Sequence, residues 1–363
     1  MKPILMKPRS LLFLALAASF IAVGIPPALA QTPPTTAQPT TPSDAQMRDS
    51  ASSTSQTPAS TSAAAPAQAG QTATPPDASK SEADESIATI SKAVNEVRVI
   101  FTVTDRHGHY IKDLKKEDFK VIDDRVPASV LSFRSETDLP LQVGLLIDAS
   151  NSVRDRFKFE QEAAIEFLNA TLRPHYDEAF VVGFDVTPEV TQDFTDNTEK
   201  LSMGVRALRA GGGTAMFDAL YFACRDKLLK HGQTGPVRRA IILLSDGEDN
   251  QSHVTREEAI EMAARADAIV YTISTNISGM KGAGDKTLER IADATGGRAF
   301  FPFQMRDVAD AFLSIQEELR SQYAVGYKPA NFIADGRYRT IEIQGPGKGM
   351  KVRTRKGYYA PKQ

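Results

Sequence analysis

Between residue 141 and about residue 322 the chain alternates between short apolar runs and longer stretches that have one inward face. The short runs are apolar at nearly every position, as strands buried on both faces are, and they cover residues 143–147, 179–184, 240–244, 269–273 and 298–303. The longer stretches repeat every three or four residues, as one face of a helix does, for example at Phe157, Gln161, Ala164, Ile165, Leu168 and Leu172. Strands that alternate with helices predict an α/β fold whose doubly wound, mostly parallel sheet is covered by helices on both sides.

Shorter strands flank this region on both sides. Before it, alternating or apolar stretches separated by turn residues predict strands at 97–103, 119–124 and 130–133. After it, stretches separated by Pro, Gly and Asn predict strands at 323–327, 338–343 and 350–354. Neither group is large enough to bury a core alone. We therefore expect residues 86–138 and 323–363 to build one small, discontinuous β-sandwich module around a central domain at residues 139–322.

The first 85 residues have the composition of a targeting segment followed by an unfolded linker. Residues 1–30 combine an early cluster of basic residues, an apolar stretch and the ending Ala28-Leu29-Ala30, which predicts a signal peptide cleaved after about Ala30. The apolar stretch is shorter than the roughly 20 residues that span a bilayer, so an uncleaved anchor is the less favoured alternative. Residues 31–85 are rich in Pro, Ser, Thr, Ala and Gln, which predicts disorder. We expect a secreted or periplasmic protein of a bacterial envelope.

Charge and cysteine content exclude several classes of function. Without residues 1–30 the chain has 40 basic and 45 acidic residues, so it lacks the basic excess of nucleic-acid-binding proteins. Cys224 is the only cysteine, and it shares a predicted helical face with Phe217 and Leu220, which indicates a buried structural thiol. The histidines lack zinc-ligand spacing and are expected at the surface; they are His107, His109, His175, His231 and His253.

One carboxylate and two hydroxyls, from Asp148, Ser150 and Ser152, follow the predicted strand at 143–147 at alternate positions. In an extended loop these side chains project to the same side, so their oxygens can converge on one cation. Oxygen-only ligands suit Mg²⁺, Ca²⁺ or Mn²⁺. The same string also occurs in ordinary loops and helix caps, so by itself it does not establish a metal site.

Two later segments strengthen the metal interpretation. Thr214 follows three glycines at the start of a predicted helix, and Asp246 follows the apolar run at 240–244. In a doubly wound sheet, ligands bind beyond the carboxyl ends of the strands, where the strand order reverses, and Asp148 and Asp246 both follow such ends. In this order the three segments resemble the metal-ion-dependent adhesion site of von Willebrand factor type A domains. The flanking strands are similar to those of a related subgroup of secreted bacterial proteins.

The resemblance implies a Rossmann-like von Willebrand factor type A domain whose metal site consists of Asp148, Ser150, Ser152, Thr214 and Asp246. These residues would hold Mg²⁺, or alternatively Mn²⁺ or Ca²⁺, and the ion would accept an Asp or Glu carboxylate from a protein partner. In this family direct coordination by the threonine can accompany tighter ligand binding, so Thr214 would be the switch element. The implied function is metal-dependent protein binding without catalysis.

Other interpretations of the same residues stay open. A phosphate-binding loop at the three glycines fits poorly because no Gly-Lys-Ser/Thr follows them. An EF-hand that starts at Asp246 fails because Gln251 stands where that loop needs glycine. Asp246 could also begin an ordinary acidic turn with a solvated continuation. A metal-assisted hydrolase would need Glu248 or Asp249 as its general base, and an architectural scaffold would bind its partner without metal.

Overall fold

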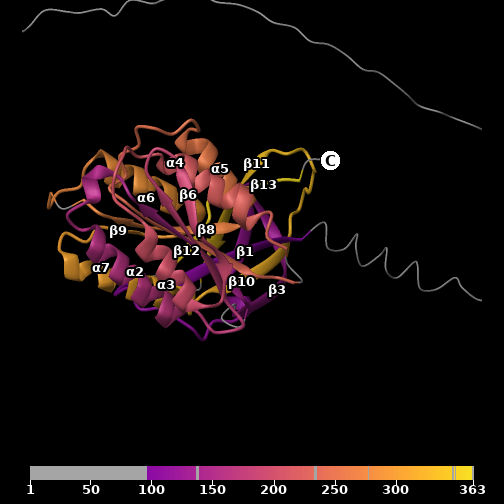
Figure 1. Cartoon of the computed structure of the whole chain (residues 1–363). Coiled ribbons are helices and arrows are strands. Elements are labelled where there is room, and N and C mark those ends of the chain that lie inside the picture. The colour runs from indigo at the N-terminus through magenta and orange to yellow at the C-terminus, as the bar shows by residue number, and fades with distance from the viewer. Residues whose placement is uncertain are drawn as a thin grey trace, which may run out of the picture. The chain divides into compact units, whose positions relative to one another are not determined.

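The structure is a computed structural model (Figure 1), and it describes residues 96–135, 139–232, 235–276, 278–345, 347 and 349–361. The predicted signal peptide and linker lie outside the described residues. Within the described part, the chain forms a central α/β domain and a β module. No helix in this part of the chain is long and apolar enough to cross a membrane.

A six-stranded sheet forms the centre of the α/β domain. Its strands, in spatial order, are β6 (Pro188–Thr195), β5 (Glu178–Phe184), β4 (Leu141–Asp148), β7 (Arg238–Ser245), β8 (Ala268–Ser274) and β9 (Ala299–Phe300). All neighbouring pairs are parallel except β5 and β6. Strands β4, β7 and β8 are buried at almost every position, which explains their uninterrupted apolar sequences. The predicted strand at 298–303 is shortened to β9, and the antiparallel edge strand β6 was not predicted.

Helices cover both faces of this sheet. One face packs against helices that lie side by side in Figure 1, namely α2 (Phe157–Thr171), α3 (Thr198–Ala207) and α7 (Met305–Leu319). The other face packs against α4 (Met216–Phe222), the π-helical turn η3 (Ala223–Leu228), α5 (Arg256–Arg265) and α6 (Ala283–Thr295). Cys224 is fully buried in this second core, as its helical pattern predicted. The prediction of a doubly wound α/β domain is confirmed.

The strand order reverses beside β4. From β4 the chain builds β5 and β6 on one side of the sheet, and it then builds β7, β8 and β9 on the other side. The carboxyl ends of β4 and β7 are hydrogen-bonded neighbours, with Ile147 opposite Leu244. This is the edge of an open α/β sheet at which ligands bind.

Strands from both ends of the described chain form a second sheet. Its spatial order is β12 (Lys351–Thr354), β1 (Val97–Thr104), β10 (Tyr323–Lys328), β3 (Val126–Ser135), β2 (Lys120–Asp123), β11 (Tyr338–Gln344) and β13 (Gly357–Tyr359), with η1 (Lys116–Asp118) before β2. All its pairs are antiparallel, and β1 pairs directly with β10. A backbone hydrogen bond from Ile341 N to Lys356 O brings the turn between β12 and β13 onto β11, so the sheet curls round its core. The predicted flanking β module is confirmed, as one curled sheet.

A buried ion pair joins this module to the α/β domain. Glu318, near the end of α7, is 1% exposed and accepts a hydrogen bond from Arg353 Nη1 of β12 at 2.9 Å. The Glu318 carboxylate also accepts from Tyr110 Oη at 2.7 Å and from Tyr271 Oη at 3.3 Å. Because a buried charge is stable only when partners surround it, these contacts fix the module against the end of α7.

Candidate functional site

The candidate site begins where β4 ends, at Asp148. This carboxylate is fully buried: its Oδ1 accepts from Ser150 N at 2.9 Å and its Oδ2 accepts from Ser245 Oγ at 2.6 Å. Ser245 is the last residue of β7, and its hydroxyl also accepts from Gly247 N at 3.0 Å. The hydroxyl of Ser245 therefore ties the end of β4 to the loop that carries Asp246.

The two predicted serines lie next to each other in the loop after β4. Ser150 Oγ and Ser152 Oγ are 2.9 Å apart, and either can be the donor. Ser150 is 2% exposed and has extended backbone, whereas Ser152 is exposed and lies within the 3₁₀ turn η2 (Asn151–Val153). The expectation of a fully extended loop is thus correct only as far as Ser150. The 3₁₀ turn brings the Ser152 hydroxyl next to the Ser150 hydroxyl, and the alternating spacing did not predict this turn.

The glycine loop before α4 packs directly on this first loop. Gly211 N donates to Ala149 O at 2.6 Å, and Gly212 O accepts from both Asn151 N and Asn151 Nδ2. Gly212 has a φ of +79°, a backbone angle that favours glycine, and a Cβ there would lie 2.8 Å from Asp185 Oδ2, so that the Asp185 side chain would have to move. Thr214, two residues further on, is 4% exposed. The loop that carries Thr214 is therefore bonded to the loop that carries Ser150.

Asp246 lies half-buried at the start of the third loop. Its Oδ1 accepts from Glu248 N at 3.0 Å. Gly247 follows with a φ of +81°, and any Cβ there would collide with the backbone of Gly284 at the start of α6. Glu248 Oε1 accepts from Gly284 N at 3.2 Å. These contacts fix the loop against α6. They also involve Glu248, one of the two residues that could serve as the general base of a hydrolase.

Burial shifts the pKa of two acids in this region. It raises the pKa of Asp148 to about 6, although hydrogen bonds from Ser245 and Ser150 lower it, and the charge of Asp246 raises it further. Burial also raises the pKa of Glu160, on α2, to about 8; Arg156 opposes this rise, while the charges of Asp148 and Asp246 add to it. A cation between these acids would stabilise their ionised forms.

Sequence reasoning did not identify Glu160. It is 2% exposed, its Oε2 has no hydrogen-bond partner among the described residues, and it lines a small cavity with Ser274, Thr275 and Gln304. A signal was present, because Glu160 lies one turn after Phe157 on the inward face of the predicted helix. A carboxylate at a position of the buried stripe is unusual enough to merit attention.

A metal site of another kind would consist of acidic, cysteine and histidine side chains. In the described part of the chain, no group of three or more His, Cys, Asp and Glu side chains is placed to hold a metal ion. Four of the histidines are exposed as expected, and His231 is half-buried against Phe194 and Glu178.

A family model described as the von Willebrand factor type A domain matches residues 143–248, which include Asp148, Ser150, Ser152, Thr214 and Asp246. A curated relative, calcium-activated chloride channel regulator 1 of Bos taurus, is 28% identical over 165 residues, which are 44% of this chain and 17% of that protein.

Similar solved structures include two further proteins. Proximal thread matrix protein 1 from the mussel byssus, in a structure described as having a zinc-occupied MIDAS motif, is 15% identical, with 55% of this chain and 50% of that chain covered and a TM-score of 0.44. The PilB minor pilin from Streptococcus sanguinis is 14% identical, with 50% and 62% covered and a TM-score of 0.40. The chain spans less than two thirds of each relative. The family match and the motif order agree, and residues 143–248 of this chain belong to a von Willebrand factor type A domain.

Proposed function

We propose that this protein binds a protein partner through a divalent metal ion held by Asp148, Ser150, Ser152, Thr214 and Asp246. The ion is Mg²⁺, with Mn²⁺ or Ca²⁺ as substitutes, and an Asp or Glu side chain of the partner completes its coordination. The observation that carries this proposal is the pair of serine hydroxyls, 2.9 Å apart, beside a fully buried carboxylate at the switch point of the sheet.

The geometry of the hydroxyl pair fits a small octahedral ion. Mg²⁺ binds oxygen at about 2.0–2.1 Å, so two neighbouring ligands at right angles are about 2.9 Å apart. Ser150 Oγ and Ser152 Oγ have this separation. The same separation is the length of the hydrogen bond that the two hydroxyls make with each other, and a bound ion would replace that bond.

The charge of the donor set supports capture of an anionic group. Three of the five proposed ligands are neutral hydroxyls, and Asp148 and Asp246 are the only carboxylates among them. A bound divalent ion is a Lewis acid, and because only two of its proposed ligands are charged, it would retain affinity for a further carboxylate. Asp148, Ser150 and Thr214 are buried while Ser152 is exposed, so the side of the site that remains open to a partner is the side of Ser152.

Titration calorimetry of the full chain with Mg²⁺, Mn²⁺ and Ca²⁺ tests the ion site. We expect about one ion per chain, and loss of binding in Asp148→Ala. Because Asp148 also bonds to Ser245 and Ser150 N, Ser152→Ala is the safer second variant, and Ser129→Ala on the exposed β3 is its matched control. Wild-type protein that is folded but binds no ion would refute the proposal.

The open coordination position has its own test. Mn²⁺ bound to the protein relaxes the protons of its bound water, so a carboxylate probe such as acetate should reduce this relaxation if it displaces water. Partner binding that survives EDTA would favour an architectural scaffold. Substrate turnover lost on replacement of Glu248 would favour a hydrolase instead.

We also propose export to a bacterial envelope, with cleavage after about Ala30, and the boundaries 86–138, 139–322 and 323–363 for the module and domain. N-terminal sequencing of the protein recovered from a periplasmic or secreted fraction tests the cleavage. A mature protein that retains residues 1–30 would contradict it.

A further inference from the structure

Helix α4 begins next to the candidate site without a cap of its own. Its N-cap residue is Ala215, which has no side-chain acceptor for the free N–H groups of the first turn. Residues of the loop after β7 supply the missing acceptors. Phe217 N donates to Asp249 Oδ2 at 3.0 Å, and Asp218 N donates to Ser252 Oγ at 3.0 Å.

The same loop holds both backbone groups of Thr214. Thr214 N donates to Asn250 Oδ1 at 3.0 Å, while Thr214 O accepts from Asn250 N at 3.0 Å and from Gln251 N at 3.1 Å. Because both the N–H and the C=O of Thr214 are bonded to one short segment, the peptide planes on either side of its Cα are fixed. The direction of its Cα–Cβ bond is then fixed as well.

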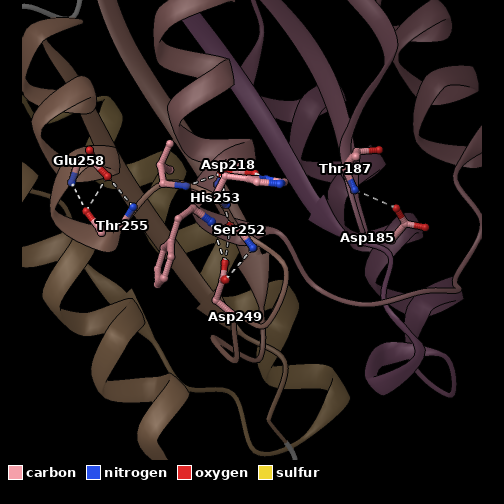
Figure 2. Close-up of polar contacts among 10 residues, drawn as sticks. Asp185, Thr187, Asp218, Asp249, Ser252, His253, Thr255 and Glu258 are labelled. Carbon is pink, nitrogen blue, oxygen red and sulfur yellow. Dashed lines mark hydrogen bonds and ion pairs between the residues drawn. The ribbon is translucent and has the colours of Figure 1, made fainter.

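Hydrogen bonds to two carboxylates, those of Asp249 and Asp218, hold the loop after β7 in one conformation. Ser252 Oγ donates to Asp249 Oδ2 at 2.7 Å, and Ser252 N donates to Asp249 Oδ1 at 3.2 Å. Asp218 in turn accepts at Oδ1 from His253 N and Val254 N, each at 2.9 Å, and its Oδ2 lies 2.9 Å from His253 Nδ1. Figure 2 shows Ser252 between Asp249 and the pair of Asp218 and His253.

The fit between the two loops leaves little free space. A Cβ at Gly213 would lie 2.7 Å from Gln251 Cγ and 2.9 Å from Asn250 Oδ1, closer than side-chain atoms pack. A larger residue at position 213 would have to displace these two side chains. Asp249 and Asn250, which could have been a solvated continuation of the turn at Asp246, instead bond to Phe217 N and Thr214 N, although Asn250 remains exposed.

We propose that residues 249–254 form a clamp that positions Thr214 for the metal ion, with Asn250 as the central positioning residue. This inference rests on the proposed ion site. Asp246 and the clamp residues belong to the same loop after β7, so the clamp also links Thr214 to Asp246. Two proposed ligands that are 32 positions apart in the sequence are thereby held together. Residues that orient a ligand without touching the metal strongly affect affinity, and their loss typically weakens metal binding by about 10- to 100-fold.

The test is the affinity of the full chain for Mn²⁺, measured by electron paramagnetic resonance of free Mn²⁺, in three variants. Asn250→Ala removes the acceptor of Thr214 N, and we expect the dissociation constant to rise by about 10-fold. Asn250→Asp keeps that acceptor and should restore most of the affinity. Asn331→Ala is the matched control, because it removes an exposed asparagine side chain outside the clamp and the ion site.

The melting temperature in EDTA separates a positioning role from a structural one. Asn250 is exposed, so Asn250→Ala should fold; if it does not, Asn250→Gln, which moves the amide by one carbon, provides the same comparison. An Asn250→Ala protein that melts earlier but binds Mn²⁺ like wild type would overturn the positioning role. Wild-type protein that binds no Mn²⁺ would instead overturn the ion site itself, and the clamp role with it.

Discussion

Replacing Glu160 by glutamine should stabilise the metal-free protein at neutral pH. Glu160 is 2% exposed and carries a carboxyl oxygen without a partner among the described residues, so the folded protein holds it in the neutral form. Burial raises its pKa from 4.5 to about 8. The unfolded chain gives up this proton above pH 4.5, whereas the folded chain retains it until about pH 8.

The size of the effect follows from this difference in protons bound. Between the two pKa values the folded state binds one proton more, so stability falls by about 1.4 kcal/mol for each pH unit of increase. At pH 7 the cost relative to pH 4.5 is about 3 kcal/mol. Glutamine has nearly the same shape and no proton to lose, so Glu160→Gln should remove this loss and gain about 3 kcal/mol at pH 7, but little at pH 4.5.

Urea unfolding in EDTA, at half-unit steps from pH 4.5 to pH 8, measures this directly. Asp148, whose pKa burial raises to about 6, leaves a smaller residual decline in the variant. Glu166→Gln on the same helix is the matched control, because Glu166 is exposed and its replacement should leave the pH profile unchanged. Parallel pH profiles for wild type and Glu160→Gln would show that Glu160 is ionised at neutral pH and would refute the reasoning.

Two further predictions concern contacts that hold the site and the module. Arg353→Met leaves Glu318 as a buried charge without its counter-ion, so we expect a loss of about 3–5 kcal/mol in unfolding free energy; Arg337→Met, at an exposed arginine of the same module, should cost less than about 1 kcal/mol. Ser245→Ala removes the hydrogen bond that lowers the pKa of Asp148. Mn²⁺ competes with the proton for this carboxylate, so binding should weaken more at pH 6 than at pH 8, and an equal loss at both values would contradict the role given to Ser245.

Much of the α/β fold was predictable because a strand that is buried on both faces has an almost entirely apolar sequence. Strands β4, β7 and β8 are covered by helices on both sides, so nearly every position is apolar. Strand β6 escaped prediction because it lies at the edge, is at least partly exposed along its length and carries Thr, Gln and Asp. Its place in the sheet depends on β5 and α3, which the local pattern does not contain.

The β module was predictable in outline for a different reason. Each of its strands is too short to be stable alone, so the sequence indicated that the two flanks had to combine. The register could not be derived, because it depends on which side chains meet. Phe101, Phe119, Phe133 and Tyr323 come from four separate segments, and their rings pack at centroid distances of 5.0 to 6.5 Å in one cluster.

The predicted ligands after β4 lie close together in the sequence, whereas the residues that hold the ligands in place contact them from distant parts of the chain. Asp148, Ser150 and Ser152 can meet one ion only if they lie close together in the chain, so their spacing is itself a signal. Asn250 has only to accept from one backbone N–H, and Ser245 has only to donate its hydroxyl to one carboxylate. Short polar side chains at many positions could make such a single bond equally well. What makes them effective is contact with a loop or strand distant in the sequence: Asn250 with Thr214, and Ser245 with Asp148. The spacing of a motif can therefore nominate the atoms that touch an ion, but the atoms that decide how firmly those ligands are held emerge only when the loops are seen together.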